Sequence, residues 1–377
     1  MKILIDLTAL SNHLSGIERF AISIAQEMIR DDSHQFILLF RNGIHPAFER
    51  TGPHVRKIVL KGNRKLWFYQ VTLPLRLFCL RADHYLFPAF PAPFLFCSRK
   101  TVNVLHDGSV WDCPEGNKWY MSLYFRILCR KAALNRKQLV TVSRFSRQRL
   151  SLALHRSPES IEVIHNGLAA HLEQFEYDAA LHRQAADAYQ LPGNYVLCLS
   201  TLEPKKNLRL LVTAYDQLLQ EGRLACDLVL AGRKGWKMDD LLRNVHPGTL
   251  ARIHMTGFVE DEHLPYLYRD ARLFVFPSTY EGFGMPPVEA MAMGAPVLAS
   301  DAASLPEVLR DGALYFESGN VEALKKAMLD ALSMNAEELS ALRKRGSAVA
   351  QSYRWSISAR KMMSLLQAKS KTPQKGR

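Results

Sequence analysis

The stretch LFVFPSTYEGFGMPPVEAM, residues 273–291, decides the fold expected for this chain of 377 residues. Its apolar beginning, 273–277, predicts a buried strand, and residues 288–293 predict a helix. Between them, two glycines allow positive φ and a close approach of the backbone, and two prolines suit the first turn of a helix. A strand, a glycine-rich loop and a helix in this order indicate a βαβ unit, whose ligand binds beyond the carboxyl end of the strand.

The alternation of short β-branched runs and longer amphipathic stretches continues in both directions, which is typical of parallel βαβ units. It predicts strands at 2–7, 35–40, 56–60, 101–105, 139–142, 161–164, 195–199, 227–231, 252–255, 273–277 and 296–300. The length of the chain also favours two domains. We therefore predict an α/β protein with two doubly wound, Rossmann-like domains, 1–168 and 169–354, followed by a basic tail, 371–377.

The loop after residue 277 predicts a ligand as well as a fold. The free N–H groups of Phe283, Gly284 and Met285 would lie at a helix N-terminus, which is a ready anion site. Glu289 is expected in the first turn of that helix, where the dipole favours its charge. A ribose diol can donate two hydrogen bonds to such a carboxylate, and Glu281 could hold the hydroxyls of a sugar. Each glutamate alone is an ordinary helix-start or turn residue, but together they suit a nucleotide sugar.

A second cluster, EPKKN at 203–207, follows the predicted strand 195–199. Lys205 and Lys206 would stand at a helix start beside a strand end, where two cations can clamp a diphosphate. The alternative is a solvated helix start, because lysine pairs are common on protein surfaces.

The spacing of Glu281 and Glu289 resembles the E-x7-E motif of retaining glycosyltransferase family 4, which has the GT-B fold and includes bacterial mannosyltransferases and glucosyltransferases of cell-surface polysaccharides. The resemblance extends over the chain and is strongest at 195–316. It implies that the two domains face each other across a cleft, the first binding the acceptor and the second the nucleotide sugar. It also implies that a terminal helix, about 355–370, returns to the first domain.

The resemblance extends to single residues. Lys206 matches a family residue that holds the donor phosphates, whereas Lys205 replaces the usual arginine and keeps the charge without the bidentate geometry. In the family, a histidine at the position of His106 faces the transferred sugar, and Asp107 is expected to orient it. Gly16 belongs to a loop that borders the donor phosphates and the acceptor.

Further family positions are expected to support the site. Gly232 ends the predicted strand 227–231, and Val259 stands where the family stacks the base. Asn166-Gly167 resembles the interdomain hinge, and Trp355 is expected to serve packing at the start of the terminal helix.

The family mechanism, carried onto this chain, gives catalytic roles to His106, Glu281 and Lys206. The acceptor hydroxyl attacks from the side of the leaving group, and a diphosphate oxygen takes its proton, so Glu281 positions hydroxyls and is not a nucleophile. The sequence has no D-x-D, and we expect no cofactor and no metal, because lysines and helix dipoles meet the charge of the leaving diphosphate.

The six cysteines lack C-x-x-C spacing and are interpreted as small buried residues in a reducing cytosol.

Charge is distributed unevenly along the chain. Residues 1–170 contain 24 Lys+Arg against 12 Asp+Glu, whereas residues 171–377 contain 25 against 24. This asymmetry indicates an anionic partner or a solvated basic face. Segments 61–81 and 118–137 mix cations with large apolar residues, which suits peripheral attachment to an anionic membrane, unless their apolar faces pack inside the domain. With no signal peptide and no spanning segment, we expect a cytoplasmic protein, peripheral at the inner face of the membrane.

Three functions remain open from the sequence. The first is transfer of a hexose to a saccharide or lipid-linked saccharide, with a lean toward mannose from GDP-mannose because 231–236 resembles mannosyltransferase relatives. The second is a sugar-nucleotide epimerase on the same scaffold. The third is a non-catalytic, basic protein that binds a membrane or nucleic acid, although no RNA-binding or helix-turn-helix motif supports nucleic acid.

Overall fold

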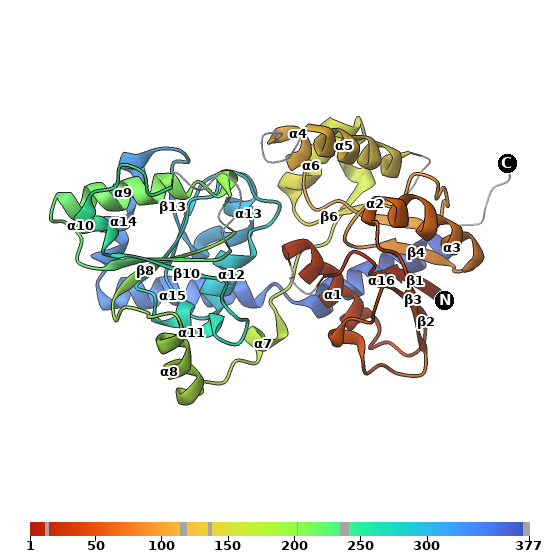
Figure 1. The fold of residues 1–377 in the computed structure, drawn as a ribbon, viewed down its shortest axis with the longest axis horizontal. Coiled ribbons are helices and arrows are strands. Elements are labelled where there is room, and N and C mark those ends of the chain that lie inside the picture. The colour runs from red at the N-terminus through yellow and green to blue at the C-terminus, as the bar shows by residue number, and fades with distance from the viewer. Residues whose placement is uncertain (12–14, 114–118, 135–137, 202, 234–240, 372–377) are drawn as a thin grey trace. The chain divides into compact units, whose positions relative to one another are not determined.

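The computed structural model describes residues 1–11, 15–113, 119–134, 138–201, 203–233 and 241–371. Contacts divide the chain into two compact units, Met1–Gly167 with Arg354–Arg377, and Leu168–Tyr353. In Figure 1 the first unit is red to yellow, with a blue terminal helix, and the second is green to blue. The chain therefore passes between the units twice.

The described part of the first unit contains a parallel sheet with the strand order β3-β2-β1-β4-β5-β6-β7. Its strands are β1 (Lys2–Asp6), β2 (Gln35–Arg41), β3 (Val55–Leu60), β4 (His84–Phe87), β5 (Thr101–Val104), β6 (Gln138–Thr141) and β7 (Ile161–Val163). The helical segments are α1 (Gly16–Met28), η1 (Pro46–Phe48), α2 (Lys65–Trp67), η2 (Phe68–Thr72), α3 (Leu73–Cys79), α4 (Ser109–Asp112), α5 (Trp119–Ala133), α6 (Arg144–Leu154), η4 (Pro158–Ser160) and α16 (Trp355–Lys371). Strand order reverses direction between β1 and β4, so the switch point of this sheet lies there.

The second unit repeats this plan with a parallel sheet ordered β10-β9-β8-β11-β12-β13 in its described residues. The strands are β8 (Tyr195–Leu199), β9 (Asp227–Ala231), β10 (Ile253–Gly257), β11 (Leu273–Phe276), β12 (Val297–Ser300) and β13 (Leu314–Phe316). The helical segments are α7 (Ala170–Glu173), α8 (Ala179–Ala188), η5 (Pro204–Lys206), α9 (Leu208–Gln220), α10 (Pro247–Leu250), α11 (Leu264–Asp270), α12 (Met285–Ala292), α13 (Leu305–Leu309), η6 (Arg310–Gly312), α14 (Val321–Leu332) and α15 (Ala336–Gln351). The doubly wound α/β architecture predicted for each half is thus confirmed, and the switch point of this sheet lies between β8 and β11.

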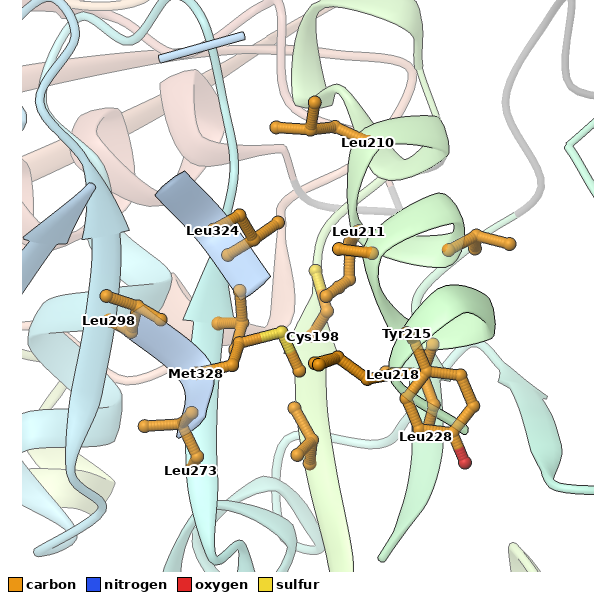
Figure 2. Packing of buried hydrophobic residues seen from close by; sticks show 14 of the residues in the cluster. Cys198, Leu210, Leu211, Tyr215, Leu218, Leu228, Leu273, Leu298, Leu324 and Met328 are labelled. Atoms are coloured by element: carbon orange, nitrogen blue, oxygen red, sulfur yellow. The ribbon is translucent and has the colours of Figure 1, made fainter. Parts of the chain in front are cut away.

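The core of the second unit forms where α9 and α14 pack on one face of its sheet. Figure 2 shows Tyr215 and Leu218 of α9 against Leu228 of β9, with Met328 of α14 beside them. All four side chains are buried, as expected for parallel strands that helices cover. Cys198 of β8 and Leu273 of β11 belong to the same core, so this layer supports both strands.

The terminal helix α16 belongs to the first unit. Its Trp355 ring lies edge-on to Phe20 of α1, with centroids 5.4 Å apart, and Ser358 Oγ donates to the His165 carbonyl at 2.6 Å. A Cβ on Gly167 would lie 2.3 Å from Trp355 N. Glycine at 167 therefore lets the two crossing segments approach closely, and Trp355 serves packing.

Several elements differ from the expectation. Strands β4 and β13 were not predicted, although they are no shorter than β7, which was. The run that forms β4 leads directly into Pro88, and a proline usually marks the end of a strand. Helices α7 and α8, which form within residues 169–189 as part of the second unit, were not predicted either. Helix α12 begins at Met285, earlier than the predicted 288, because its first turn accommodates both prolines.

The cysteine interpretation is right for half of the cysteines. Cys129, Cys198 and Cys226 are buried, whereas Cys79 and Cys97 are exposed, and all six are reduced. Exposed thiols lie on the helical segment and loop that follow β3 and β4, where side chains point to solvent. No helix in the described ranges combines the length and apolar character that crossing a bilayer requires.

Candidate functional site

The loops after β8 and β11 are joined at the carboxyl edge of the second sheet. The backbone N–H of Thr279 donates to the Lys205 carbonyl at 2.9 Å, and Ser278 Oγ lies 3.2 Å from the same oxygen. These strands are neighbours at the switch point, from which the chain leaves in opposite directions. Open α/β sheets bind their ligands at this position.

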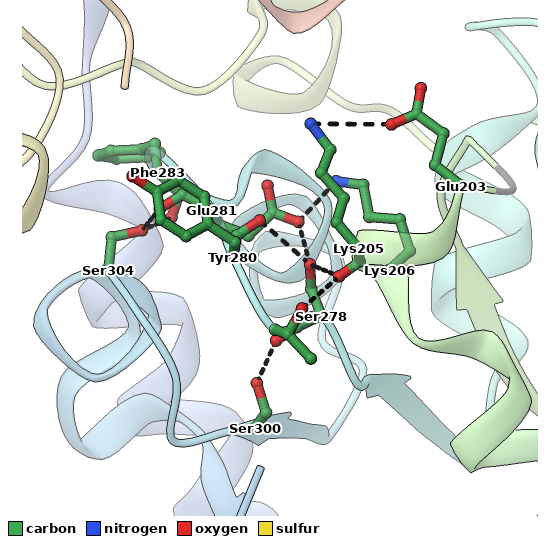
Figure 3. A network of polar contacts seen from close by, with 10 residues as sticks. Glu203, Lys205, Lys206, Ser278, Tyr280, Glu281, Phe283, Ser300 and Ser304 are labelled. Carbon is green, nitrogen blue, oxygen red and sulfur yellow. Dashed lines mark hydrogen bonds and ion pairs between the residues drawn. The ribbon is translucent and has the colours of Figure 1, made fainter. Parts of the chain in front are cut away.

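Two residues predicted for the site, Lys206 and Glu281, form an ion pair (Figure 3). Lys206 Nζ lies 2.5 Å from Glu281 Oε1, and the side chains are only 14% and 12% exposed. Ser278 Oγ donates to the same carboxylate oxygen at 2.7 Å, and the ammonium also lies 5.5 Å from the Phe276 ring centroid. The structure thus places a fixed cation and a fixed carboxylate side by side at the strand ends.

Lys205 is held differently from its neighbour. Its Nζ lies 3.7 Å from Glu203 Oε2, and both side chains are about one-third exposed. Figure 3 shows the Lys205 side chain reaching toward Glu203 while Lys206 reaches toward Glu281. The two lysines of the predicted clamp are therefore not equivalent, since Lys206 pairs with Glu281 and Lys205 pairs with the more exposed Glu203.

The backbone of the glycine-rich loop has little freedom. Gly284 caps α12 with φ +94°, and a Cβ at this position would lie 2.7 Å from Leu305 Cδ2. Ser304 Oγ lies 3.0 and 3.1 Å from the carbonyl oxygens of Glu281 and Phe283, so its one proton can be donated to either of them. With these carbonyls held by Ser304, the start of α12 from Met285 is fixed at the edge of the sheet, where a helix N-terminus favours an anion.

The predicted location of Glu289 in the first turn of its helix is wrong. Because α12 begins at Met285, Glu289 is the fifth helical residue and lies beyond the first turn. The dipole of the helix therefore gives its charge little support. Instead Tyr268 Oη, from α11, donates to Glu289 Oε2 at 2.8 Å, and both side chains are buried.

Gly232 and Val259 follow the next two strands, β9 and β10, of the same sheet. Gly232 has φ +128°, and a Cβ would lie 1.9 Å from the Ser200 carbonyl oxygen. Its N–H donates to the Gly257 carbonyl at 2.8 Å. Packing alone thus requires glycine at 232, whatever binds there. Val259 is buried, and neither residue has a described contact with the Lys206–Glu281 pair.

In the first unit, His106 follows β5 and is oriented by a backbone carbonyl. Its Nε2 lies 2.9 Å from the Pro88 carbonyl oxygen, and its ring stands edge-on to Phe20 at 5.0 Å. Burial lowers the pKa of His106, although the Pro88 hydrogen bond and the charge of Asp107 oppose the shift. A neutral imidazole that donates through Nε2 keeps Nδ1 as an acceptor, so it can take a hydrogen bond from a hydroxyl.

Asp107 was expected to orient His106, but its carboxylate is used elsewhere. Asp107 Oδ1 accepts a hydrogen bond from the Ser109 N–H at 2.8 Å, at the start of α4. The Pro88 carbonyl holds the imidazole instead. Asp107 therefore acts on the histidine through its charge.

Gly16 is the first residue of α1, and among the described residues a Cβ there would meet no atom within 4 Å. Packing within the unit therefore leaves its missing side chain unexplained. Glu18, for which the sequence suggested no role, accepts from the Ser15 N–H and from Ser11 Oγ, each at 2.8 Å. The Ser-x-x-Glu spacing at 15–18 is the signal that could have revealed this role.

Sequence reasoning missed other residues that hold the site. Tyr268, Ser278 and Ser304 carry no motif of their own, and their contacts depend on which elements become neighbours. Within the ranges that the structure describes, no three His, Cys, Asp or Glu side chains gather as ligands for a metal ion. Residues 234–236, part of the stretch that resembles mannosyltransferase relatives, lie outside the described residues.

Both halves of the chain match models of glycosyltransferase families. Residues 184–349 match the family described as glycosyl transferases group 1, and residues 14–171 match glycosyltransferase family 4. The chain is 31% identical to O-antigen chain mannosyltransferase B of Escherichia coli, over 94% of this chain and 96% of that protein. A shorter similarity, 25% identity over 61% of this chain and 60% of the relative, links it to O-antigen chain mannosyltransferase RfbU of Salmonella typhimurium.

Solved structures share the fold of the whole chain. A glycosyltransferase from Rickettsia africae superposes with a TM-score of 0.74 at 17% identity, covering 98% of this chain and 99% of that one. HepE from Anabaena, solved with UDP and glucose, superposes with a TM-score of 0.71 at 19% identity over 98% of this chain and 100% of HepE. WaaG, a glycosyltransferase of lipopolysaccharide biosynthesis, gives 0.73 at 14% identity, covering 97% of this chain and 99% of WaaG.

Proposed function

The chain belongs to glycosyltransferase family 4 and is an enzyme of that class, and from this premise we propose that it transfers a hexose from a nucleotide-diphosphate sugar to a saccharide or lipid-linked saccharide. The observation that carries the proposal is the cluster of Lys206, Glu281 and Glu289 around the loop beyond β11. The cation and the helix N-terminus suit phosphate groups, and the two carboxylates suit hydroxyls. Together they suit a ligand whose phosphates lie between two polyols.

The donor would bind at the carboxyl edge of the second sheet. Phe283, Gly284 and Met285 offer backbone N–H groups at the start of α12, and Lys205 and Lys206 offer positive charge for the diphosphate. Glu289 would accept hydrogen bonds from the ribose hydroxyls, with Tyr268 holding its carboxylate. Gly232 and Val259 would border the base.

Transfer would retain the configuration of the sugar. The acceptor oxygen forms a bond to the anomeric carbon on the side where the bond to the diphosphate breaks, and a diphosphate oxygen takes the acceptor proton. Glu281 would hold sugar hydroxyls, because its Oε1 already accepts from Lys206 and Ser278. Lys206 and the α12 amides would stabilise the departing diphosphate, so the reaction would need no metal.

The transferred sugar is proposed to be mannose, from GDP-mannose. This choice is supported by the 31% identical relative, which is an O-antigen chain mannosyltransferase. UDP-hexoses are the competing donors, since HepE was solved with UDP-glucose. The first unit would bind the acceptor, with Gly16 bordering it and neutral His106 accepting a hydrogen bond from a sugar hydroxyl.

The family membership and the transferase names of the relatives favour this function over an epimerase or a non-catalytic binding protein. The proposal includes no nucleic-acid partner. It includes the anionic inner face of the cell membrane as the place where a lipid-linked acceptor is met, which suits the basic first half of the chain.

Thermal stabilisation by nucleotides tests the proposal directly. The protein is melted with GDP, UDP, ADP and their sugars, with a chelator and without added metal. A selective rise in Tm with GDP and GDP-mannose is the expected result, because a ligand that binds only the folded state stabilises it. A selective rise in Tm with UDP compounds would mean that the donor is a UDP-sugar and not GDP-mannose. If no nucleotide raises the Tm of folded protein, the proposed donor site is refuted.

A further inference from the structure

The helical segment formed by α2, η2 and α3 is apolar on both sides. On its inner side Phe68, Leu73 and Leu77 pack into the core of the first unit. On its outer side Leu66, Trp67, Leu75 and Phe78 are each 61–64% exposed. A helix that is apolar all round is normally surrounded by other apolar material, and in the described residues nothing covers this outer side.

Helix α5 also carries apolar residues on both its inner and its outer side. Ser122, Leu128, Cys129 and Ala132 face inward, while Tyr120, Leu123 and Ile127 are each 48% exposed at helical spacing. Trp119, at the start of the helix, is 77% exposed. A surface helix ordinarily turns polar residues outward, so these large apolar side chains call for a partner.

The two segments adjoin, so their exposed residues belong to one surface. Gln70 Nε2 of η2 donates to Tyr124 Oη of α5 at 2.6 Å. Gln70 Oε1 also accepts from the Phe94 N–H at 2.9 Å, and the Phe94 ring lies edge-on to Tyr124, with centroids 5.8 Å apart. We call the outer sides of α2–α3 and α5 the apolar-basic face.

Charge on this face has one sign. Residues 61–81 contain five lysines and arginines and no acidic residue, and residues 119–134 contain three and none. Lys61, Arg64, Lys65, Arg76 and Arg130 are exposed. Tryptophan, tyrosine and aliphatic side chains interleaved with lysine and arginine are the composition that inserts at a bilayer interface, where the cations meet anionic headgroups.

We propose that the apolar-basic face docks this protein on an anionic lipid bilayer, with Trp67, Phe78 and the outer side of α5 entering the interface. A membrane fits better than a protein partner because the cations lie among the apolar side chains, with no acidic residue to specify a complementary charge pattern. The inference deepens the proposed function by naming the surface that would meet a lipid-linked acceptor. Docking itself needs no sugar transfer.

The test is co-sedimentation of the full-length protein with vesicles. One set is phosphatidylcholine alone, and the other contains phosphatidylglycerol. We expect binding to the anionic vesicles that weakens as salt rises, and a loss of about tenfold or more in the variant Trp67→Gln/Leu123→Gln, because two exposed apolar side chains no longer enter the interface. The matched control is Leu250→Gln, which changes an exposed leucine of the second unit and should bind like the wild type.

A second variant, Arg64→Gln/Arg76→Gln, should lose anionic selectivity, with Arg343→Gln/Lys344→Gln on α15 as its control. Equal melting temperatures show that each variant is folded. Wild-type affinity in both face variants would overturn the proposal. Failure of the wild type to bind anionic vesicles would also overturn it. If the wild type self-associates instead and the variants do not, the face joins copies of the chain and does not dock on a membrane.

The same samples are assayed with a soluble saccharide acceptor to separate the two proposals. Face variants that transfer sugar normally to the soluble acceptor but do not sediment support docking as a separate property. A wild type that binds vesicles but transfers no sugar would refute the proposed function and leave the docking face standing.

Discussion

Tyr268 Oη, from α11, donates a hydrogen bond to Glu289 Oε2, from α12, at 2.8 Å, and both side chains are buried. This contact orients a carboxylate that lies beyond the first turn of its helix and receives little help from the dipole. Tyr268 itself is held by an edge-on contact with Phe274, with ring centroids 5.5 Å apart. A neutral hydroxyl thus holds the carboxylate that we assign to the donor ribose.

Replacing Tyr268 by phenylalanine removes this hydrogen bond and keeps the ring. We expect the donor Kd to rise about threefold to tenfold, the equivalent of one hydrogen bond, while kcat changes little. Glu289→Ala should abolish donor binding. Calorimetric titration with the donor nucleotide measures both. Tyr215→Phe is the control, because Tyr215 Oη bonds the Cys226 carbonyl in the same unit. A Kd that moves equally in both tyrosine variants would contradict the orienting role.

Lys206→Ala removes the cation that is paired with Glu281. We expect turnover to fall about 100-fold or more, and donor affinity much less, because charge develops on the diphosphate as it leaves. Lys205→Ala is the matched variant and should cost less, since Lys205 is more exposed and pairs with Glu203. Steady-state kinetics at a fixed acceptor concentration measure both variants. Equal losses of turnover would contradict a specific role for Lys206.

Gly16→Ala separates a ligand contact from a packing requirement. The new methyl group meets no atom of the residues that the structure describes within 4 Å, and alanine favours the helix that begins at this residue. We expect the free energy of unfolding to stay constant or rise by up to about 1 kcal/mol, while kcat/KM falls about tenfold or more. Gly193→Ala, also in open space, should leave both unchanged. Full activity in Gly16→Ala would remove Gly16 from the site.

Asp6 ends β1 at the switch point of the first sheet, and burial raises its pKa to about 6. The folded protein therefore binds this proton more tightly than the unfolded chain, whose aspartate titrates near its ordinary value. Stability should fall as pH rises from about 4 to 6, and an ionised Asp6 should cost about 2–3 kcal/mol above that range.

Asp6→Asn keeps an oxygen for the Thr8 N–H, which donates to Asp6 Oδ1 at 3.1 Å, and removes the buried charge. We expect it to raise the melting temperature at pH 7–8 and to flatten the dependence between about pH 4 and 6. Melting curves across this range provide the measurement. A variant less stable than the wild type at neutral pH would mean that the ionised carboxylate is stabilised by its surroundings.

Local features of the site were accessible from the sequence. Gly284 must adopt φ +94°, and the strand-loop-helix pattern placed it at the carboxyl end of β11. The Glu281–Glu289 spacing and the lysines after β8 were visible for the same reason, since each lies in one short segment. The exact start of α12 was not, because prolines tolerate several positions in a first turn, and this misplaced Glu289 relative to the helix dipole.

The sequence by itself determined the elements, the two doubly wound halves and the loops that carry the charged side chains, because backbone sterics and apolar periodicity act over a few residues. Only the tertiary structure decided the partners. Lys206 meets Glu281, 75 residues away, because β8 and β11 pair at a switch point. Tyr268 meets Glu289 because α11 packs beside α12. Such contacts depend on which strands and helices become neighbours, and no local pattern encodes that choice.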